Sequence, residues 1–139
     1  MIALSRDPCP TVAQLDHVAL VTKDVEGLRD FYQQLRGVAS ALCTDADTGL
    51  HTCVLDFCGV RLELLERPGD GERHDGDGRP LGLFHLGFAL GSADAVDELS
   101  GAIGAAGYRV LEPPHRVGPF GRYQSVVLDP DGNRVKLTV

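Results

Sequence analysis

Two histidines and a glutamate are the residues of this chain whose types and spacing suggest shared chemistry. His17 and His85 each lie inside a short apolar segment, and they are 68 residues apart. Together with the carboxylate of Glu63, two imidazoles form a donor set that suits a divalent metal ion with open coordination positions. A lone strand histidine is more often a hydrogen-bonded core residue than a ligand. The metal hypothesis therefore depends on whether the fold makes the two histidines equivalent.

An internal repeat predicts that equivalence. The strand-like segment 16–21 is followed by Asp24, a candidate helix N-cap, and then by a helical stretch; segment 84–90 is followed in the same way by Ser92 and a second helix. The offset of 68 that relates the histidines also relates the apolar faces of the two helices, with Leu28 matching Val96, Phe31 matching Leu99 and Leu35 matching Ile103. The shared offset indicates a duplicated unit.

Each half continues with three short strand-like segments. They span about 38–44, 49–57 and 60–66 in the first half, and about 107–111, 122–128 and 133–139 in the second, with turns at 58–59 and 129–132. Five extra residues in the second half fit a long loop at 113–121. The sequence thus predicts an α+β fold of two βαβββ modules, at about 15–66 and 83–139, in one domain spanning 1–139. A solvated Gly/Asp/Arg-rich linker is expected at 67–81.

Side-chain alternation in the last strand of each half predicts which residues face away from the helices. If the apolar positions pack against the helices, the opposite, concave face carries Arg61 and Glu63 in the first half and Arg134, Lys136 and Thr138 in the second. A two-residue turn at 58–59 would place Asp56 opposite Arg61, which predicts a cross-strand ion pair.

Composition narrows the class of protein. The chain has 139 residues, 43% of them hydrophobic, which suits a single globular domain. Its 13 basic and 20 acidic residues give a net charge of −7, the wrong sign for a general nucleic-acid binder. We expect neither a membrane span nor a signal peptide. The four cysteines form no C-x-x-C pair, so reduced thiols in the cytoplasm are the expectation.

Four segments resemble the vicinal oxygen chelate superfamily, which includes glyoxalase I, bleomycin-resistance proteins, fosfomycin-resistance enzymes, methylmalonyl-CoA epimerase and extradiol dioxygenases. They are DHVAL at 16–20, VRLELLE at 60–66, FHLGF at 84–88 and DPDGNRVKL at 129–137. With the repeat, they cover nearly the whole chain from residue 15 onward. The resemblance implies an open eight-stranded cup around a small-molecule site and, by family habit, a homodimer. Whether the modules pair within one chain or between two stays open.

The resemblance also implies a set of ligands. In metal-using members these come from the first and last strands of each module, which correspond to His17, Glu63, His85 and position 136. The first three match, but position 136 is Lys136, where members with this motif commonly carry Glu. An ammonium about 4 Å from a divalent ion is repelled by several kcal/mol. Lys136 therefore either moves aside or loses its proton beside a three-ligand site, or its ammonium takes the place of the metal next to Glu63.

Two functions follow from these alternatives. The preferred hypothesis is a metal-dependent enzyme of lyase, isomerase or oxygenase type. His17, Glu63 and His85 would hold Fe, Mn, Zn, Ni or Co, and Glu63 and Lys136 would act in catalysis. The alternative is a metal-free small-molecule binding or resistance protein of the bleomycin-resistance type. A subunit whose cup is filled by its own side chains is a third hypothesis. Further candidates for contacting a substrate are Arg61, His115, Arg122 and Tyr123.

Overall fold

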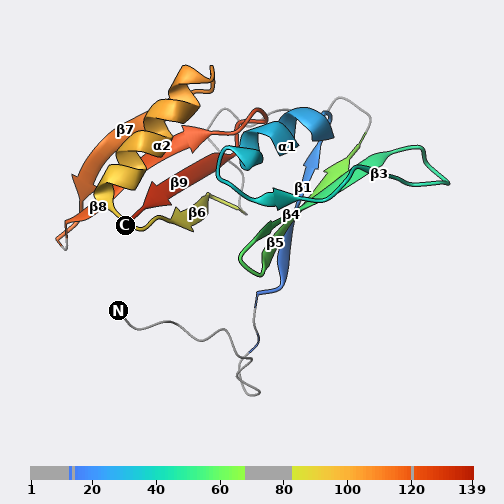
Figure 1. Cartoon of the computed structure of the whole chain (residues 1–139), viewed down its shortest axis with the longest axis horizontal. Helices are drawn as coiled ribbons and strands as arrows, with labels where there is room; N and C mark the ends of the chain where they lie inside the picture. Colours follow the sequence, from blue (N-terminus) through green and yellow to red (C-terminus); the bar gives the residue numbers. More distant parts are fainter. Residues whose placement is uncertain (1–12, 14, 68–82, 120) are drawn as a thin grey trace.

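Two sheets, each with one helix, lie side by side in the computed structural model, which describes residues 13, 15–67, 83–119 and 121–139 (Figure 1). The first module comprises β1 (His17–Thr22), α1 (Val25–Gln33), β2 (Val38–Ala39), β3 (Cys43–Thr44), β4 (His51–Phe57) and β5 (Val60–Glu66). The second comprises β6 (Leu86–Ala89), α2 (Ala93–Ala105), β7 (Val110–Val117), β8 (Arg122–Leu128) and β9 (Arg134–Thr138). The predicted α+β architecture of two βαβββ modules is confirmed. Nearly all of the predicted linker, from residue 68 onward, lies outside the described residues.

The two sheets repeat the same strand order. The first runs β1-β5-β4-β2, with β3 also pairing with β4, and the second runs β6-β9-β8-β7. β1 pairs in parallel with β5, and β6 pairs in parallel with β9. The register places Ala19 beside Glu63 and Gly87 beside Lys136, so Glu63 and Lys136 are equivalent positions. Among the described strands, β1 and β6 are edge strands of two open sheets.

Both helices begin at the predicted caps. The Asp24 side chain accepts a hydrogen bond from the Gly27 amide at 3.0 Å, and the Ser92 hydroxyl accepts one from the Ala95 amide at 3.1 Å. Each bond satisfies an amide of the first turn that has no partner within the helix. In the described part of the chain, neither helix is long and apolar enough to cross a membrane.

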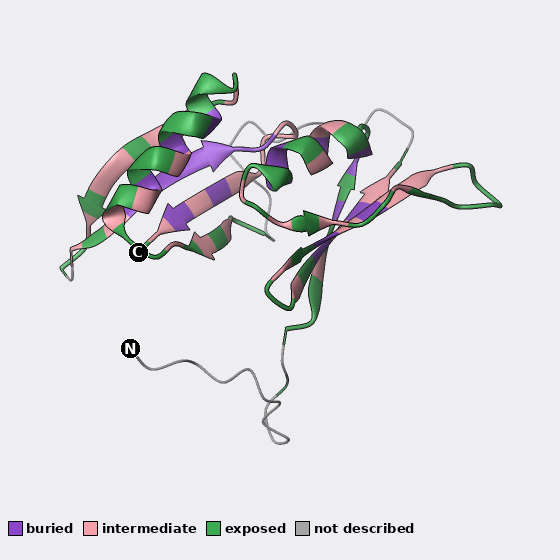
Figure 2. Cartoon of the chain, in the orientation of Figure 1, coloured by how far each residue is buried: buried purple, intermediate pink, exposed green. Residues whose placement is uncertain are grey.

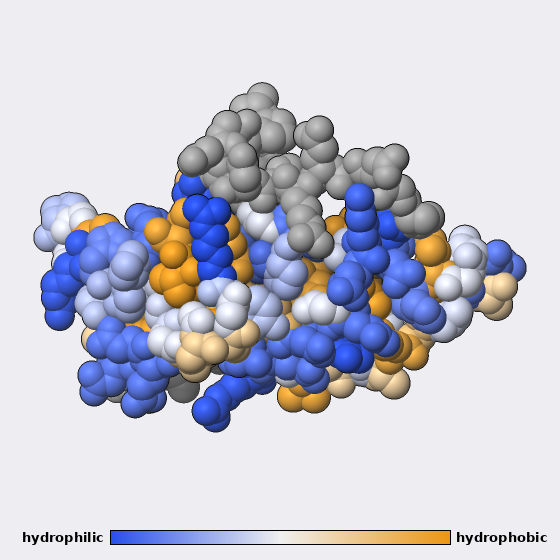
Figure 3. Space-filling view, turned by 90° about the horizontal axis from the view of Figure 1, so that it is seen from above, coloured by the Kyte–Doolittle hydropathy of each residue, from blue (hydrophilic) through white to orange (hydrophobic). Residues whose placement is uncertain are grey.

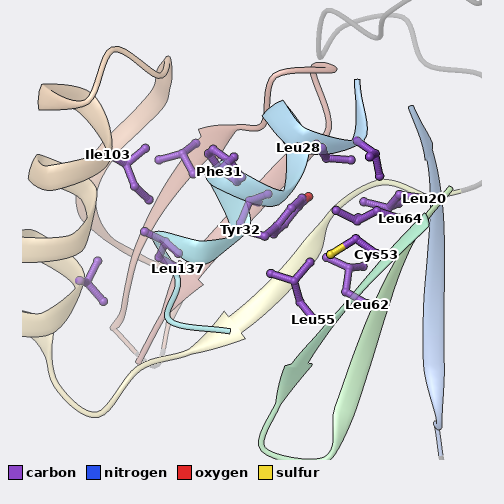
Figure 4. Packing of buried hydrophobic residues seen from close by; sticks show 14 residues of the cluster. Leu20, Leu28, Phe31, Tyr32, Cys53, Leu55, Leu62, Leu64, Ile103 and Leu137 are labelled. Carbon is purple, nitrogen blue, oxygen red and sulfur yellow. The ribbon is translucent and has the colours of Figure 1, made fainter. Parts of the chain in front are cut away.

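One hydrophobic core joins the helix-facing sides of the two modules. α1 lies between the sheets: Leu55, Leu62 and Leu64 point toward it from one side, and Leu137 lies on its other side (Figure 4). Buried residues gather in α1, in the middle strands and on the side of α2 that faces them (Figure 2). Because the helix-facing sides share this core, the concave faces of both sheets point away from it.

A buried hydrogen bond also connects the modules. The Tyr32 hydroxyl of α1 donates to Asp129 Oδ2 at 2.7 Å. The other Asp129 oxygen accepts from the amides of Asp131 and Asn133, each at 2.9 Å, which holds the turn before β9 closed. Burial raises the pKa of Asp129, although these hydrogen bonds act in the opposite direction. The DPDGN motif therefore serves as a structural turn and a contact between modules.

Two predicted elements differ from the structure. The segment 38–44 is split into β2 and β3, because the Ser40 hydroxyl takes up the Val54 amide at 3.0 Å and interrupts the ladder. The predicted long loop at 113–121 is wrong: β7 continues to Val117, with register shifts that accommodate the additional residues, and only a short connection precedes β8.

Candidate functional site

His17 and Glu63 meet on the concave face of the first sheet. His17 opens β1 and Glu63 lies in the middle of β5, and the alternating neighbours Leu20, Leu62 and Leu64 are buried on the helix side. The distance from His17 Nε2 to Glu63 Oε2 is 3.9 Å. This predicted pair is therefore side by side, at a separation too long for a hydrogen bond.

Asp16 and Arg61 extend this pair. Asp16 Oδ2 lies 2.8 Å from His17 Nδ1, and Arg61 Nη2 lies 3.0 and 2.8 Å from the two Asp16 oxygens. The hydrogen bonds from His17 and then Arg61 lower the pKa of Asp16. The predicted register of Asp56 opposite Arg61 is confirmed, but the predicted ion pair between them is wrong. Asp56 instead accepts a hydrogen bond from the Gly59 amide at 2.8 Å and closes the turn, and Arg61 pairs with Asp16.

In the second sheet, the position equivalent to Glu63 carries a positive charge, that of Lys136. His85 directly precedes β6, and Lys136 lies on the concave side of β9, opposite the buried Val135 and Leu137. The pKa of His85 is lowered, first by burial and then by the charges of Lys136 and Arg134. Its imidazole is therefore neutral at neutral pH, with one ring nitrogen free to act as a ligand.

The three predicted ligands lie on two sheets. His17 and Glu63 are neighbours on the first sheet, whereas His85 lies at the start of the second, where the charge of Lys136 contributes to lowering its pKa. Within the described residues of one chain, no three His, Cys, Asp or Glu side chains are grouped closely enough to hold a metal ion. His85 thus does not join the His17–Glu63 pair within a single chain.

Apart from Arg61 on the first sheet, the candidate substrate contacts lie on both sides of the second sheet. His115 belongs to β7 and not to a loop; its Nδ1–H donates to the Pro113 carbonyl at 2.7 Å, and its register partner is Gln124. The Tyr123 hydroxyl donates to Asp97 of α2, so Tyr123 lies on the helix side. Arg122 takes the alternate position of β8 and lies on the concave side.

Sequence reasoning did not single out two features of the concave surface. One is the bond of Asp16 to His17, although Asp16 directly precedes the histidine. The other is a pair of buried oxygens, Gln124 Oε1 and Thr138 Oγ1, which have no hydrogen-bond partner among the described residues. Gln124 and Thr138 are register partners, two residues along each strand from the pair Val126 and Lys136 and therefore on the same face. Alternation along β8 would have identified Gln124 as a concave-face residue.

A separate depression lies on the helix side of the molecule. It measures about 900 Å³ and is lined by the end of α1, the segment that leads into α2 and one face of α2. None of the predicted site residues contributes to it. On the face seen from above, hydrophobic areas are interspersed with hydrophilic side chains (Figure 3).

The two βαβββ modules, with a His–Glu pair on an open sheet, agree with the resemblance to the vicinal oxygen chelate superfamily that the sequence motifs indicated. The model of the Glyoxalase/Bleomycin resistance protein/Dioxygenase superfamily matches residues 14–137, and the chain belongs to this family. Among curated proteins, none matches the chain.

Solved structures confirm the fold. A glyoxylase/bleomycin resistance protein/dioxygenase domain from Frankia sp. EAN1pec is 21% identical with a TM-score of 0.77, over 93% of this chain and 98% of that one. A variant of the fosfomycin resistance protein FosX from Listeria monocytogenes, complexed with Mn(II) and 1S,2S-dihydroxypropylphosphonic acid, is 21% identical with a TM-score of 0.70, over 91% and 92%. A variant of glyoxalase I from Zea mays is 18% identical with a TM-score of 0.73, over 90% of this chain and 44% of that one.

The donor set fits a divalent ion at the His17–Glu63 pair. An ionised carboxylate only accepts hydrogen bonds, so the contact with Asp16 places the proton of a neutral His17 on Nδ1. The lone pair of Nε2 then faces a carboxylate oxygen 3.9 Å away. Two such acceptors gain nothing from each other, but a cation between them would bind both. Metal–ligand bonds of about 2.1 Å span at most about 4.2 Å between two ligand atoms, so the pair can bind one ion after a small adjustment.

Proposed function

We propose that this protein is a metal-dependent enzyme acting on a small, oxygen-bearing substrate, with its site shared between two copies of the chain. The observation that carries the proposal is the 3.9 Å pair of acceptors, His17 Nε2 and Glu63 Oε2, on an open concave face. In the proposed homodimer, the partner's His85 supplies the third ligand and the partner's Lys136 faces Glu63. A cytoplasmic location belongs to the same proposal.

Exposed edges and apolar side chains support the homodimer. Among the described strands, β1 and β6 are edge strands, which present unpaired backbone groups to a second chain. Leu15 and Val21 on the β1 side are 68% and 52% exposed, and Leu83 and Phe84 before β6 are 46% and 58% exposed. A twofold axis that brings β1 of one copy beside the partner's β6 would cover all four side chains and join the two half-sites.

The residues divide the chemistry between the half-sites. The ion, when bound, would polarise a substrate oxygen and stabilise negative charge that develops on it. His17, Glu63 and the partner's His85 would hold the ion and leave positions open for the substrate. The partner's Lys136 would bind an anionic group or an oxyanion of the substrate, or give it a proton. Arg61 lies close enough to this face to orient a substrate, but its contact with Asp16 already engages it.

Elemental mass spectrometry of the purified, untagged protein tests the proposal. About one divalent ion per chain is expected, before and after chelator stripping and reloading with single metals. His17→Ala and His85→Ala should each abolish the stoichiometric ion. His51→Ala is the matched control, because His51 hydrogen-bonds to Thr44 on the other face of its sheet. Metal retained by both site variants, or no uptake by the wild type, would refute the proposal.

One observation favours a second function, the metal-free binding protein. Lys136 acts electrostatically on His85, and its ammonium could replace the cation beside Glu63 of a second copy. This alternative predicts no metal uptake and a ligand captured without chemical change. Lys136→Glu distinguishes the two: a metal-free protein would acquire metal binding with this change, whereas a metalloenzyme would only bind its metal more tightly.

A further inference from the structure

A continuous chain of polar contacts leads from Arg61 to the candidate metal ligand His17. Arg61 Nη2 lies within 3.0 Å of both Asp16 oxygens, and Asp16 Oδ2 lies 2.8 Å from His17 Nδ1. The opposite ring nitrogen, Nε2, faces Glu63 Oε2. Backbone pairing supports the arrangement, because the Arg61 amide donates to the Asp16 carbonyl and Arg61 is the register partner of His17.

These contacts fix the orientation and the proton of an imidazole. A free neutral histidine exchanges its proton between the two ring nitrogens and rotates about its side-chain bonds. An ionised carboxylate on the Nδ1 side selects the form in which Nδ1 is protonated, and this leaves the lone pair on Nε2. A carboxylate in this position also makes the imidazole a stronger donor to a metal ion.

Stability does not explain the contacts. The side chains of Asp16, Arg61 and His17 are 65%, 46% and 46% exposed. Ion pairs this exposed contribute little to folding because water and salt screen them. The ordering of three side chains beside a concave face is better explained by what it does to the imidazole.

The second module shows what the same positions do without the carboxylate. The repeat places Phe84 where Asp16 stands, and Arg134 where Arg61 stands. Arg134 lies over the Phe84 ring, with its guanidinium carbon 5.0 Å from the ring centroid. The arginine is thus present in both modules, but it binds a carboxylate in the first and an aromatic ring in the second.

We propose that Asp16, held by Arg61, is a positioning residue that fixes His17 with its proton on Nδ1 and makes it the stronger of the two histidine ligands. The effect on metal binding rests on the proposed function, whereas the protonation of His17 on Nδ1 is a property of the metal-free protein. His17 binds first and His85 completes the site.

Nitrogen-15 NMR of the imidazole rings in the chelator-stripped protein, above the pH at which histidines are charged, tests the protonation of His17. In the wild type, His17 should show a protonated Nδ1 and an unprotonated Nε2. Asp16→Ala should return the ring to a mixture of the two forms. Asp30→Asn is the matched control, because Asp30 is an exposed carboxylate whose ion pair with Arg29 lies on α1. An unchanged His17 spectrum in Asp16→Ala would overturn the inference.

Calorimetric titration with Zn²⁺ alone tests whether Asp16 strengthens metal binding by His17. Asp16→Ala should weaken binding by about 10- to 100-fold, the usual effect of removing a partner of a ligating histidine. Asp16→Glu should recover part of the affinity, and Asp30→Asn should have none of this effect. Thermal unfolding should be nearly unchanged in all three variants, which separates positioning from folding. Wild-type Zn²⁺ affinity in Asp16→Ala would refute the inference while leaving the proposed metal site in place.

The converse experiment introduces a carboxylate at the equivalent position of the second module. Phe84→Asp places a carboxylate between Arg134 and His85 in the second module, and it should shift His85 toward the form with a protonated Nδ1. If the wild type binds no Zn²⁺ while both NMR results hold, the proposed function fails and the positioning role of Asp16 stands. If Phe84→Asp leaves the His85 spectrum unchanged, a carboxylate at this position does not control the imidazole, and the inference is wrong.

Discussion

The two modules of this chain share a backbone plan but differ in the charge on their concave faces. β1 with β5 and β6 with β9 pair in parallel in the same register. On the helix side, apolar residues occupy equivalent positions, with Leu62 and Leu64 matching Val135 and Leu137. On the concave side, Glu63 corresponds to Lys136 and Asp16 corresponds to Phe84. Packing against a helix restricts what a position can hold, whereas an open face can change charge without loss of the fold.

Under the proposed function, this difference would make each module half of a site. The first half offers an imidazole and a carboxylate that attract a cation, and the second offers a neutral imidazole beside two positive side chains. A single chain with two identical faces could form a symmetric site, but the observed faces are complementary. The contrast teaches that the two modules keep the positions that pack against the helices and differ on the opposite side of each sheet.

The largest effect is expected from making the faces alike. Lys136→Glu removes a positive charge and adds a negative one beside the proposed ion, so Zn²⁺ affinity should rise by more than about tenfold at low salt. Calorimetric titration measures the change. Lys23→Glu makes the same change of charge on an exposed residue before α1 and serves as the control. Equal affinities of Lys136→Glu and the wild type would show that position 136 does not face the ion.

The connection between the modules should respond next. Tyr32→Phe removes the hydroxyl that donates to Asp129, and it leaves a buried carboxylate oxygen short of one partner. Unfolding free energy should fall by about 1–3 kcal/mol, as measured by chemical denaturation. Tyr108→Phe provides the comparison, because Tyr108 packs edge-to-face against Phe31 through its ring. An unchanged free energy of unfolding in Tyr32→Phe would mean that the hydrogen bond makes no net contribution to the stability of the chain.

Two carboxyls, one from each module, should titrate on opposite sides of the ordinary value of 3.8. Hydrogen bonds from His17 and Arg61 lower the pKa of Asp16, so its small contribution to stability, screened by solvent, is present above pH 3.8 and lost as the pH falls through the folded value. Burial raises the pKa of Asp129, so its contribution is present below pH 3.8 and lost as the pH rises through the folded value. Carbon-13 NMR of the two carboxyls between about pH 2 and pH 7 checks the order. Asp16 titrating at the higher pH would contradict it.

The smallest effect on stability is expected from Thr138, on the concave face of the second sheet. Thr138→Val replaces a hydroxyl that has no hydrogen-bond partner among the described residues by a methyl group of the same shape. Because such a swap removes the cost of burying a polar atom, the melting temperature should stay the same or rise slightly. Ser125→Ala is the contrast: its hydroxyl contacts Ser100 at 2.8 Å, and its loss should lower the melting temperature. A clear destabilisation by Thr138→Val would show that this hydroxyl contributes to the fold.

The fold was predicted well because residues that pack in the core recur at regular spacings along the sequence. The offset between the helices, the caps at Asp24 and Ser92, and the alternation in β5 and β9 all derive from burial or from helix ends, and each is confirmed. The break at Ser40 and the extension of β7 were missed because they depend on one side-chain hydrogen bond and on register shifts. Neither leaves a repeating pattern in the sequence.

The candidate site was predictable only in part. Alternation placed Glu63 and Arg61 on the concave face, and repeat symmetry paired His17 with His85. The repeat did not reveal that α1 packs between the two sheets, or that His85 is not grouped with His17 and Glu63 among the described residues of one chain. The choice of Asp16 over Asp56 as the partner of Arg61 depends on distances that a register alone does not supply.

The placement of α1 between the sheets has a genetic consequence under the proposed homodimer. Each chain contributes its first half-site to one active centre and its second half-site to the other. A cell that produces one chain with His17→Ala and another with His85→Ala would then assemble mixed dimers with one intact centre and one doubly damaged centre. Two inactive alleles would complement each other within a single gene, and activity would return to about half of the wild-type value per mixed dimer.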